Sequence, residues 1–318
     1  LTRIKQTLVS MLRESREPLS GEALCRRIGV SRVTVWKHVQ ALQRLGYPIE
    51  ASRRGYRLMR REDIIQPWEF PGREGRIHCH REIDSTMNAA RALARQGCPA
   101  FTVVTAERQL QGRGRMQRTW HSEEGGLYFT IVLRPQLPAA FGALATFAAG
   151  VVWAQELAED YGLPVGLKWP NDLLADERKL CGLLAEMETR GDMVNFVNIG
   201  VGLNVNNAPS GHEPRAIALK EIVGRPLSRR NLLTRFLDRF ETRMEAQNFD
   251  DVMTQWKALT VTLGRSVVIQ TVQGTLSGTA RDVDETGALM LEQPDGTLTR
   301  VVHGDCFHSE RKVIDAGL

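Results

Sequence analysis

The strongest constraint on the fold of this 318-residue chain is the pattern of its first 62 residues. Apolar positions at helical spacing predict a helix over 2–16, a short second helix from Ser20 to Gly29, and a third helix capped by Ser31. Two helices joined by a tight glycine turn form a helix-turn-helix. The following run, YPIEASRRGYRLM, predicts two short strands around a turn, so we predict a winged helix.

Charge is distributed unevenly along the chain. Residues 1–62 hold 14 Lys and Arg against 5 Asp and Glu, a net +9, whereas residues 63–318 hold 28 against 32, a net −4. Binding to DNA needs cations gathered on one face, and the third helix and the wing both supply them. We therefore expect DNA as the partner of this segment, with a protein-interaction module as the alternative. The candidate DNA-binding residues are Ser31, Arg32, Thr34, Lys37, Arg44, Arg53 and Arg54.

The rest of the chain has the pattern of an α+β protein. REDIIQPWEFPGREG has no periodicity and is predicted to be a linker. Helices are expected at 85–96 and about 140–161, and strands at FTVVTA, GLYFTIVL, GLKWPNDLL, LCGLLAEME and NFVNIGVGLNV. Because several strands follow one another directly, we expect an antiparallel or mixed sheet with helices packed on it. Short β runs from residue 263 predict a small β-barrel. The predicted domains are 1–62, 63–262 and 263–318.

Composition and cysteine spacing exclude several classes of protein. With 42% hydrophobic and 25% charged residues, the chain is an ordinary globular one and not a disordered one. Its five cysteines are scattered without a CxxC pair, so neither a disulfide framework nor a zinc site is expected, and a cytoplasmic location fits best. We expect no metal site at His78, Cys79 and His80. No run approaches 18 apolar residues, so neither a membrane span nor a secretory leader is expected.

One loop carries the clearest chemical signal. The central region has no GxSxG, Walker loop or HExxH motif, but ERQLQGRGRMQRTW places Gly112, Arg113, Gly114, Arg115 and Arg118 within seven residues. Glycines expose backbone amides and arginines are permanent planar donors, so the loop suits a carboxylate or a phosphate. Alone it could be an exposed basic loop without a ligand. It is accompanied, however, by a polar helix start at 84–88, by KWPND, by RKLCG and by NIGVGLNVN.

These motifs, in this order, resemble those of the biotin protein ligases. STMN, QGRGR, Trp120, KWPNDLL, RKLCGLLAE and NIGVGLNVN all take part, and SRVTVWKH is similar to the DNA-binding helix of the bifunctional members. The resemblance covers the whole chain. It implies a catalytic domain like that of class II aminoacyl-tRNA synthetases, followed by an SH3-like domain.

The resemblance also implies a reaction and its residues. Biotin and ATP, with Mg²⁺, would give biotinyl-5′-AMP, and the biotinyl group would pass to a lysine of a biotin carboxyl carrier protein. No enzyme nucleophile is needed, because cations can join the carboxylate and the α-phosphate by positioning and charge stabilisation. The implied catalytic residues are Arg115 and Lys179. Those implied for biotin are Ser85, Thr86, Met87, Gln109, Gly112, Arg113, Gly114, Arg115 and Lys179, and those for ATP or adenylate are Arg115, Arg118, Lys168 and Asn204. Trp120 and Trp169 are taken as packing, with a place in the pocket wall as the alternative.

The implied partners are the carrier protein and operator DNA, bound by a homodimer that the ligand promotes, and no membrane. No bound prosthetic group is expected. Two alternatives stay open: a ligand-sensing DNA-binding regulator without transferase activity, and a lipoate-protein ligase. Two departures from the family pattern are visible. Met116 and Gln117 stand where the family usually has Arg and Gly, and no Trp follows the NVN segment to cover an adenine.

Overall fold

The computed structural model describes residues 2–59, 63–246, 249 and 251–309. By their internal contacts these residues form two compact units. The first unit comprises Leu1–Cys79 with Ser228–Leu232, and the second comprises His80–Leu227 with Leu233–Leu318. The first unit thus continues past the predicted domain boundary at residue 62.

The first unit contains the predicted winged helix-turn-helix. Its elements are α1 (Thr2–Glu14), α2 (Gly21–Ile28), α3 (Arg32–Arg44), β1 (Ile49–Ser52) and β2 (Gly55–Leu58). The Ser20 hydroxyl accepts a hydrogen bond from the N–H of Ala23 (3.1 Å), and the Ser31 hydroxyl accepts one from Thr34 (3.2 Å). These side chains satisfy amide groups that a helix start leaves unpaired. Both caps therefore lie where the sequence predicted them.

The segment after the wing was predicted to be a linker, and this is wrong. It forms a 3₁₀ turn, η1 (Pro67–Glu69), and the Trp68 ring is buried in the apolar core of the first unit. The Trp68 indole donates to the Tyr47 hydroxyl (2.8 Å), which donates to Glu69 (2.6 Å). Glu69 also pairs with Arg13 and Arg230. A large indole buries much apolar area and finds a partner for its N–H, which fixes this irregular segment.

The second unit is built on a seven-stranded sheet. Its strands, in spatial order, are β3 (Ile77–Ile83), β4 (Thr102–Gln109), β5 (Leu127–Leu133), β9 (Met193–Leu203), β8 (Arg178–Arg190), β7 (Asp172–Ala175) and β6 (Gly166–Lys168). Every pairing from β4 across to β6 is antiparallel. GLKWPNDLL was predicted as one strand-like run and forms two strands, because Pro170 has no N–H to continue a ladder.

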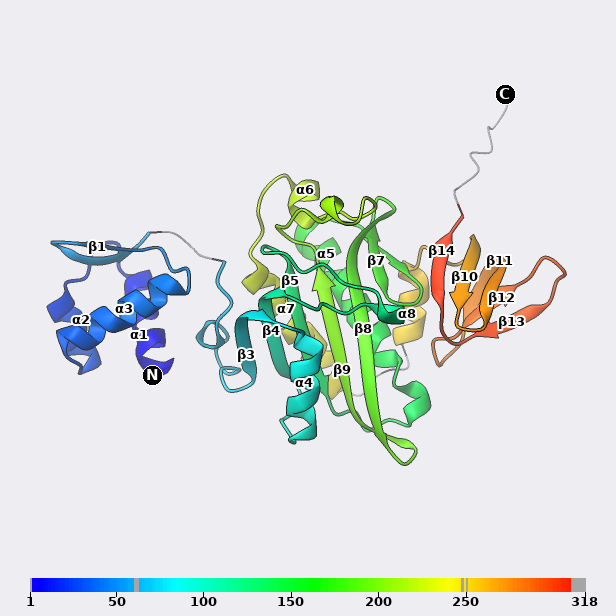
Figure 1. The fold of residues 1–318 in the computed structure, drawn as a ribbon, viewed down its shortest axis with the longest axis horizontal. Helices are drawn as coiled ribbons and strands as arrows, with labels where there is room; N and C mark the ends of the chain where they lie inside the picture. Colours follow the sequence, from blue (N-terminus) through cyan, green and yellow to red (C-terminus); the bar gives the residue numbers. More distant parts are fainter. Residues whose placement is uncertain (1, 60–62, 247–248, 250, 310–318) are drawn as a thin grey trace, which may run out of the picture. The chain divides into compact units, whose positions relative to one another are not determined.

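Helices cover both faces of this sheet (Figure 1). Helix α4 (Thr86–Arg95) packs on one face, and α5 (Leu144–Tyr161), α7 (Arg229–Glu245) and α8 (Val252–Leu259) lie on the other. Short α6 (Leu219–Val223) and the turns η2 (Arg115–Gln117), η3 (Ala139–Phe141) and η4 (Pro209–Gly211) lie in loops. Ala139–Tyr161 has the length and hydropathy of a membrane span, but 78% of its most apolar window is buried inside the protein. It is a core helix.

The C-terminal part of the second unit is a five-stranded antiparallel sheet. It orders β13 (Leu298–Val301), β12 (Leu289–Glu292), β11 (Gly274–Val283), β10 (Ser266–Thr271) and β14 (Asp305–His308). Its two end strands, β13 and β14, have no register with each other among the described residues, so the sheet is open between them.

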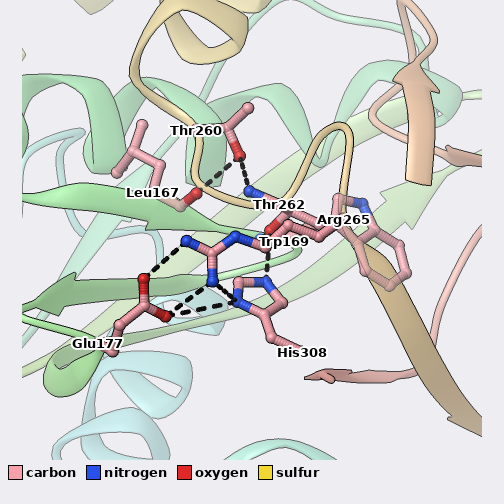
Figure 2. A network of polar contacts seen from close by, with 7 residues as sticks. All are labelled: Leu167, Trp169, Glu177, Thr260, Thr262, Arg265 and His308. Atoms are coloured by element: carbon pink, nitrogen blue, oxygen red, sulfur yellow. Dashed lines mark hydrogen bonds and ion pairs between the residues drawn. The ribbon is translucent and has the colours of Figure 1, made fainter. Parts of the chain in front are cut away.

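Polar contacts join this small sheet to the central one (Figure 2). Arg265 donates two hydrogen bonds to Glu177 (2.7 and 2.8 Å), which lies in the turn between β7 and β8. Burial lowers the pKa of His308 to about 4, so its imidazole is neutral at pH 7, and it shares a hydrogen bond of 3.1 Å with the Thr262 hydroxyl. Thr262 in turn accepts from the N–H of Trp169 (3.0 Å). The turn that leads into β8 is therefore held by the C-terminal sheet.

Candidate functional site

A pocket lies over the face of the central sheet that carries α4. Positions along the pocket can be given by residues of strand β9. Alternate residues of a strand face the same side and are spaced by about 7 Å. Gly200 pairs with Thr130 and Leu184, Gly202 pairs with Gly182, and Asn204 follows the strand end. The pocket lining can therefore be described at three successive levels.

Uncharged hydrogen-bonding groups line the level of Gly200. Gln109 Oε1 accepts from the N–H and the hydroxyl of Thr86 (2.8 and 3.0 Å), and Thr130 bonds to the same hydroxyl (2.9 Å). The neighbouring Ser85 is only 1% exposed, and its Oγ has no hydrogen-bond partner among the residues that the structure describes. A buried hydroxyl without a partner costs free energy, so this end of the pocket suits a ligand with small polar groups.

Trp120 lies across the level of Gly202. A Cβ atom added to Gly202 would lie 2.4 Å from the Trp120 ring, and one added to Gly182 would lie 2.8 Å from it. The two paired glycines thus leave the space that the indole occupies. Lys179 Nζ is 5.3 Å from the ring centroid, close enough for a cation–π contact. Trp120 was taken as packing, with a place in the pocket wall as the alternative, and the structure places it in the pocket wall.

Replacing Gly202 by alanine is expected to displace Trp120 and lower kcat/KM for the pocket's ligand by at least about 10-fold, because overpacking forces side chains off their positions. Steady-state kinetics together with tryptophan fluorescence would measure it. Gly200→Ala is the matched comparison, since the closest atom to its Cβ would be the flexible end of Met87 at 2.9 Å, and the other neighbours lie at ordinary contact distances of 3.5 and 3.6 Å. Equal effects of the two substitutions would contradict the role given to Trp120.

Five cations line the same pocket: Arg113, Arg115, Arg118, Lys168 and Lys179. Lys179 pairs with Asp172 (2.8 Å), and Arg118 with Asp305 (2.7 Å). Arg115 donates to Asn171 (3.3 Å), and burial lowers the pKa of its guanidinium from the usual value. Lys168 lies 5.9 Å from the centroid of the Phe307 ring. Cations concentrated in a partly buried space favour an anionic ligand.

Arg113 occupies a different position at the edge of this group. It donates to Asn88 (3.0 Å) and pairs with Glu186 (3.0 Å). Among the residues predicted for catalysis, biotin and nucleotide, Gly112 alone is not part of the pocket lining that the structure describes. Its carbonyl accepts from the N–H of Trp120 (2.9 Å), and a Cβ there would lie 2.2 Å from the Trp120 carbonyl oxygen. Gly112 therefore lies where the two ends of the basic loop, residues 112 and 120, come together.

The two residues that depart from the family loop adopt an unusual backbone. Met116 has φ 50° and Gln117 has φ 60°, in the left-handed region that favours glycine. The chain thus keeps at Gln117 a conformation that a glycine would take without cost. Relative to the family pattern, the loop therefore lacks one arginine charge at Met116 and has a strained backbone at Gln117.

The level beyond Gly202 is formed by Asn204 and the loop after it. Asn204 Oδ1 accepts from Asn207 (3.0 Å), so part of its hydrogen-bonding capacity is used within the protein. The rings of His121 and His212 stack with centroids 4.3 Å apart, and His212 Nε2 is 2.6 Å from Glu123. Both rings line the pocket. They are flat groups in a chain that has no tryptophan directly after the NVN segment to cover an adenine. Nothing in the sequence pattern brought His121 and His212 together.

Sequence reasoning also missed the contribution of the C-terminal sheet. Asp305, Cys306 and Phe307 on β14 all line the pocket. They follow Lys168 by more than a hundred residues, and no motif links the two segments. Trp169 also lines the pocket, but it is only 1% exposed and its indole donates to the carbonyl of Gly287 (3.0 Å), which agrees with the packing role predicted for it.

The predicted DNA-binding residues lie on the first unit. Arg32, Lys37, Arg44, Arg53 and Arg54 are exposed on α3 and the wing. Ser31 and Thr34 share a hydrogen bond of 2.9 Å at the start of α3 and cap the helix. Their hydroxyls therefore stabilise the start of α3 whether or not DNA is bound.

Comparisons with known proteins agree with this division. Family models match in succession: an HTH domain over residues 5–57, the biotin/lipoate A/B protein ligase family over 80–204, and a biotin protein ligase C terminal domain over 262–309. The bifunctional ligase/repressor BirA of Bacillus subtilis (strain 168) is 32% identical, covering 92% of this chain and 95% of that protein. The protein of the same name from Escherichia coli (strain K12) is 30% identical, covering 90% and 91%.

One solved structure is also similar. It is the biotin protein ligase from Aquifex aeolicus in complex with biotin and ATP, with 28% identity and a TM-score of 0.61. The match covers 73% of this chain and 98% of that one.

Proposed function

The chain belongs to the biotin protein ligase family, in the branch that joins a helix-turn-helix domain to a ligase domain, and from this premise we propose that it activates biotin with ATP to biotinyl-5′-AMP. The biotinyl group then passes to a lysine of a biotin carboxyl carrier protein. In its second role the protein represses transcription of biotin genes in response to biotin. The three domains are proposed to be 1–62, 63–262 and 263–318.

One observation carries the ligase proposal: the pocket divides into an uncharged hydrogen-bonding end and a cationic middle. Ser85, Thr86 and Gln109 offer donors and acceptors that suit the ureido ring of biotin, and the unpartnered Ser85 hydroxyl supports this assignment. The biotin carboxylate then reaches the level of Lys179. The biotin side is completed by Met87, Arg113 and Gly114. Gly112 contributes by allowing the two ends of the basic loop to come together.

The chemistry follows from this arrangement. A carboxylate oxygen of biotin attacks the α-phosphorus of ATP, and the bond to the leaving pyrophosphate breaks. Both reactants are anions, so Arg115 and Lys179 lower the barrier by holding them together and stabilising developing charge. Arg118 and Lys168 hold phosphate groups. Asn204 lies at the ribose, with the base towards His212. In the second step the carrier lysine attacks the acyl carbon and AMP leaves.

Mg²⁺ is part of the proposal as a companion of ATP. No group of three or more His, Cys, Asp or Glu side chains able to hold a metal is found within the described ranges. Two of the carboxylates that line the pocket, Asp172 and Asp305, are each paired with a cation. Because Mg²⁺ keeps several waters and binds through one or two carboxylates plus phosphates, these residues fit an ion that arrives with the nucleotide. Such an ion would neutralise phosphate charge, with Asp172 or Asp305 as a ligand.

The ligase proposal predicts biotin-dependent release of pyrophosphate from ATP, followed by a gain of one biotinyl group on a carrier domain. A coupled pyrophosphate assay and mass spectrometry measure the two steps separately. Lipoate is the necessary control substrate, since the matched family model includes lipoate ligases. Release with lipoate and not with biotin would overturn the substrate assignment, and release with neither would overturn the activity.

For the repressor role, we propose that the adenylate-filled protein forms a homodimer that places two winged helices on an operator with two half-sites. Tighter binding of the adenylate to the dimer would couple biotin supply to DNA binding. All five cysteines are free thiols, which supports the cytoplasmic location that we propose.

A further inference from the structure

Two large apolar side chains are exposed on α3, and the proposed function leaves them unexplained. Val33 is 62% exposed and Trp36 is 52% exposed. On the opposite side of the helix, Val35, Val39 and Leu42 are fully buried. Residues three apart on a helix are neighbours on its surface, so Val33 and Trp36 form one apolar patch.

This patch is not needed by the core of its own unit. The aromatic side chains Tyr47 and Trp68 already lie in that core, together with the buried face of α3. Single exposed apolar residues are common and need no explanation. Here a tryptophan and a valine are exposed together, on the helix face that also carries Lys37. The core does not need them, and polar residues at these positions would make the surface more soluble.

The charge around the patch identifies its partner. Lys37, Arg53 and Arg54 are exposed, and their side chains form no ion pair with any residue that the structure describes. The segment 1–62 carries a net charge of +9. Lys37 lies four residues after Val33 on the same helix, so an exposed cation adjoins the apolar patch within a segment of high positive charge. This combination is complementary to duplex DNA, whose phosphates flank base edges that include the thymine methyl group.

We infer that Val33 and Trp36 read base edges in the DNA major groove by apolar contact, and that thymine is among the bases read. Both lie in the first half of α3, the second helix of the helix-turn-helix, whose N-terminal residues face the bases when such a helix enters the groove. The cations Lys37, Arg53 and Arg54 contact phosphates and give affinity without sequence preference. This inference rests on the proposed DNA-binding role and adds the residues that specify sequence.

The test uses the full-length protein with biotin and ATP. Duplexes that the parent protein prefers are selected from a randomised DNA pool, and binding to the best duplex and to a scrambled one is measured over a range of salt concentrations. Trp36→Ala and Val33→Ala should each weaken the preferred duplex by about 10- to 100-fold, and leave the scrambled duplex and the salt slope unchanged. Lys37→Ala should weaken both duplexes and reduce the salt slope by about 0.9.

Controls separate base contact from folding. Val272→Ala removes a side chain that is 72% exposed in the second unit and should change nothing. Thermal unfolding of each variant shows whether the winged helix is intact, and Val33→Ala provides a second, milder variant. Repeating the selection with Trp36→Ala should give a motif with relaxed preference at one or more thymine positions. An inverted repeat in the parent's motif would also support the proposed dimer.

The outcomes are distinct. Equal weakening of the preferred and scrambled duplexes by Trp36→Ala would overturn the inference and assign the residue to general affinity. Unchanged affinity and motif in both apolar variants would overturn it as well. If the parent protein binds neither duplex, the proposed DNA-binding function itself fails, and with it the assignment of a partner to the patch.

Discussion

Replacing Lys179 by methionine is expected to slow adenylate formation by about 10²- to 10³-fold, because removing one preorganised charged donor at a reacting anion costs about that much. Methionine keeps the length of the side chain and removes its charge. Lys179 Nζ lies 2.8 Å from Asp172 and 5.3 Å from the centroid of the Trp120 ring, in the part of the pocket where the carboxylate and the phosphates are proposed to meet. Single-turnover measurement of pyrophosphate release isolates this step from transfer to the carrier.

Two controls make the result specific. Lys257 also pairs with an aspartate (Asp282, 2.7 Å) but does not line the pocket, so Lys257→Met should retain activity. Lys179→Met also leaves Asp172 without its cation, which could by itself impair the site. The double variant Asp172→Asn with Lys179→Met removes that unpaired charge and should remain slow. Recovery of the rate in the double variant would show that Lys179 only neutralises Asp172.

The second large effect concerns stability and comes from Glu156 in α5. Its side chain is fully buried, and neither carboxylate oxygen has a hydrogen-bond partner in the described structure. Burial, with a smaller contribution from Asp160, raises the pKa of Glu156 to about 8. The neighbouring core is aromatic: Trp153 stacks on Phe236 at 4.5 Å. The folded protein therefore keeps Glu156 protonated at neutral pH.

Replacing Glu156 by glutamine should increase the free energy of unfolding at pH 7 by about 3 kcal/mol relative to the parent, and by little at pH 4.5. The unfolded chain releases this proton near pH 4.5 and the folded chain near pH 8. The parent is thus stabilised by the protonated group at low pH and loses that stability as the pH rises through this range. Glutamine is neutral throughout, so the difference between variant and parent should grow with pH and level off above pH 8.

Denaturant unfolding between pH 4.5 and pH 8.5 measures this difference. Glu159→Gln is the matched control, since Glu159 lies on the same helix with its side chain 60% exposed and paired with Arg239. Its effect should be below about 1 kcal/mol, as for most exposed ion pairs. A difference between Glu156→Gln and the parent that does not change with pH would mean that Glu156 is ionised in the folded protein.

The winged helix could be predicted almost residue by residue, because its signals are local. Ser20 and Ser31 cap the helices they precede, and the wing turns at Ser52 to Gly55 as its sequence indicates. Most strands of the central sheet were also predicted, since alternating or continuous apolar runs mark them. The edge strand β3 was not among the predicted runs, and GLKWPNDLL was predicted as one run that a proline divides into two strands.

Most of the pocket residues could likewise be named from sequence motifs. All residues predicted for catalysis, biotin and nucleotide line the pocket except Gly112. What could not be predicted was which other residues join them. Trp120 enters the pocket wall only because Gly182 and Gly202, distant in sequence, pair on adjacent strands. Trp68 was missed for a similar reason. It is buried against the helices of the first unit, whereas the sequence around it is charged and has no apolar periodicity that would indicate burial.

By itself, then, the amino-acid sequence determined the winged helix, the strand-rich central region and the order of the motifs that carry the chemistry, because caps, periodicity and loop composition act over a few residues. Only the tertiary structure decided that Asp305 and Phe307 close the pocket, that His121 stacks on His212, and that Val33 and Trp36 remain uncovered. These features depend on contacts between distant segments. Such contacts are set by how whole sheets and helices pack, which no short stretch of sequence records.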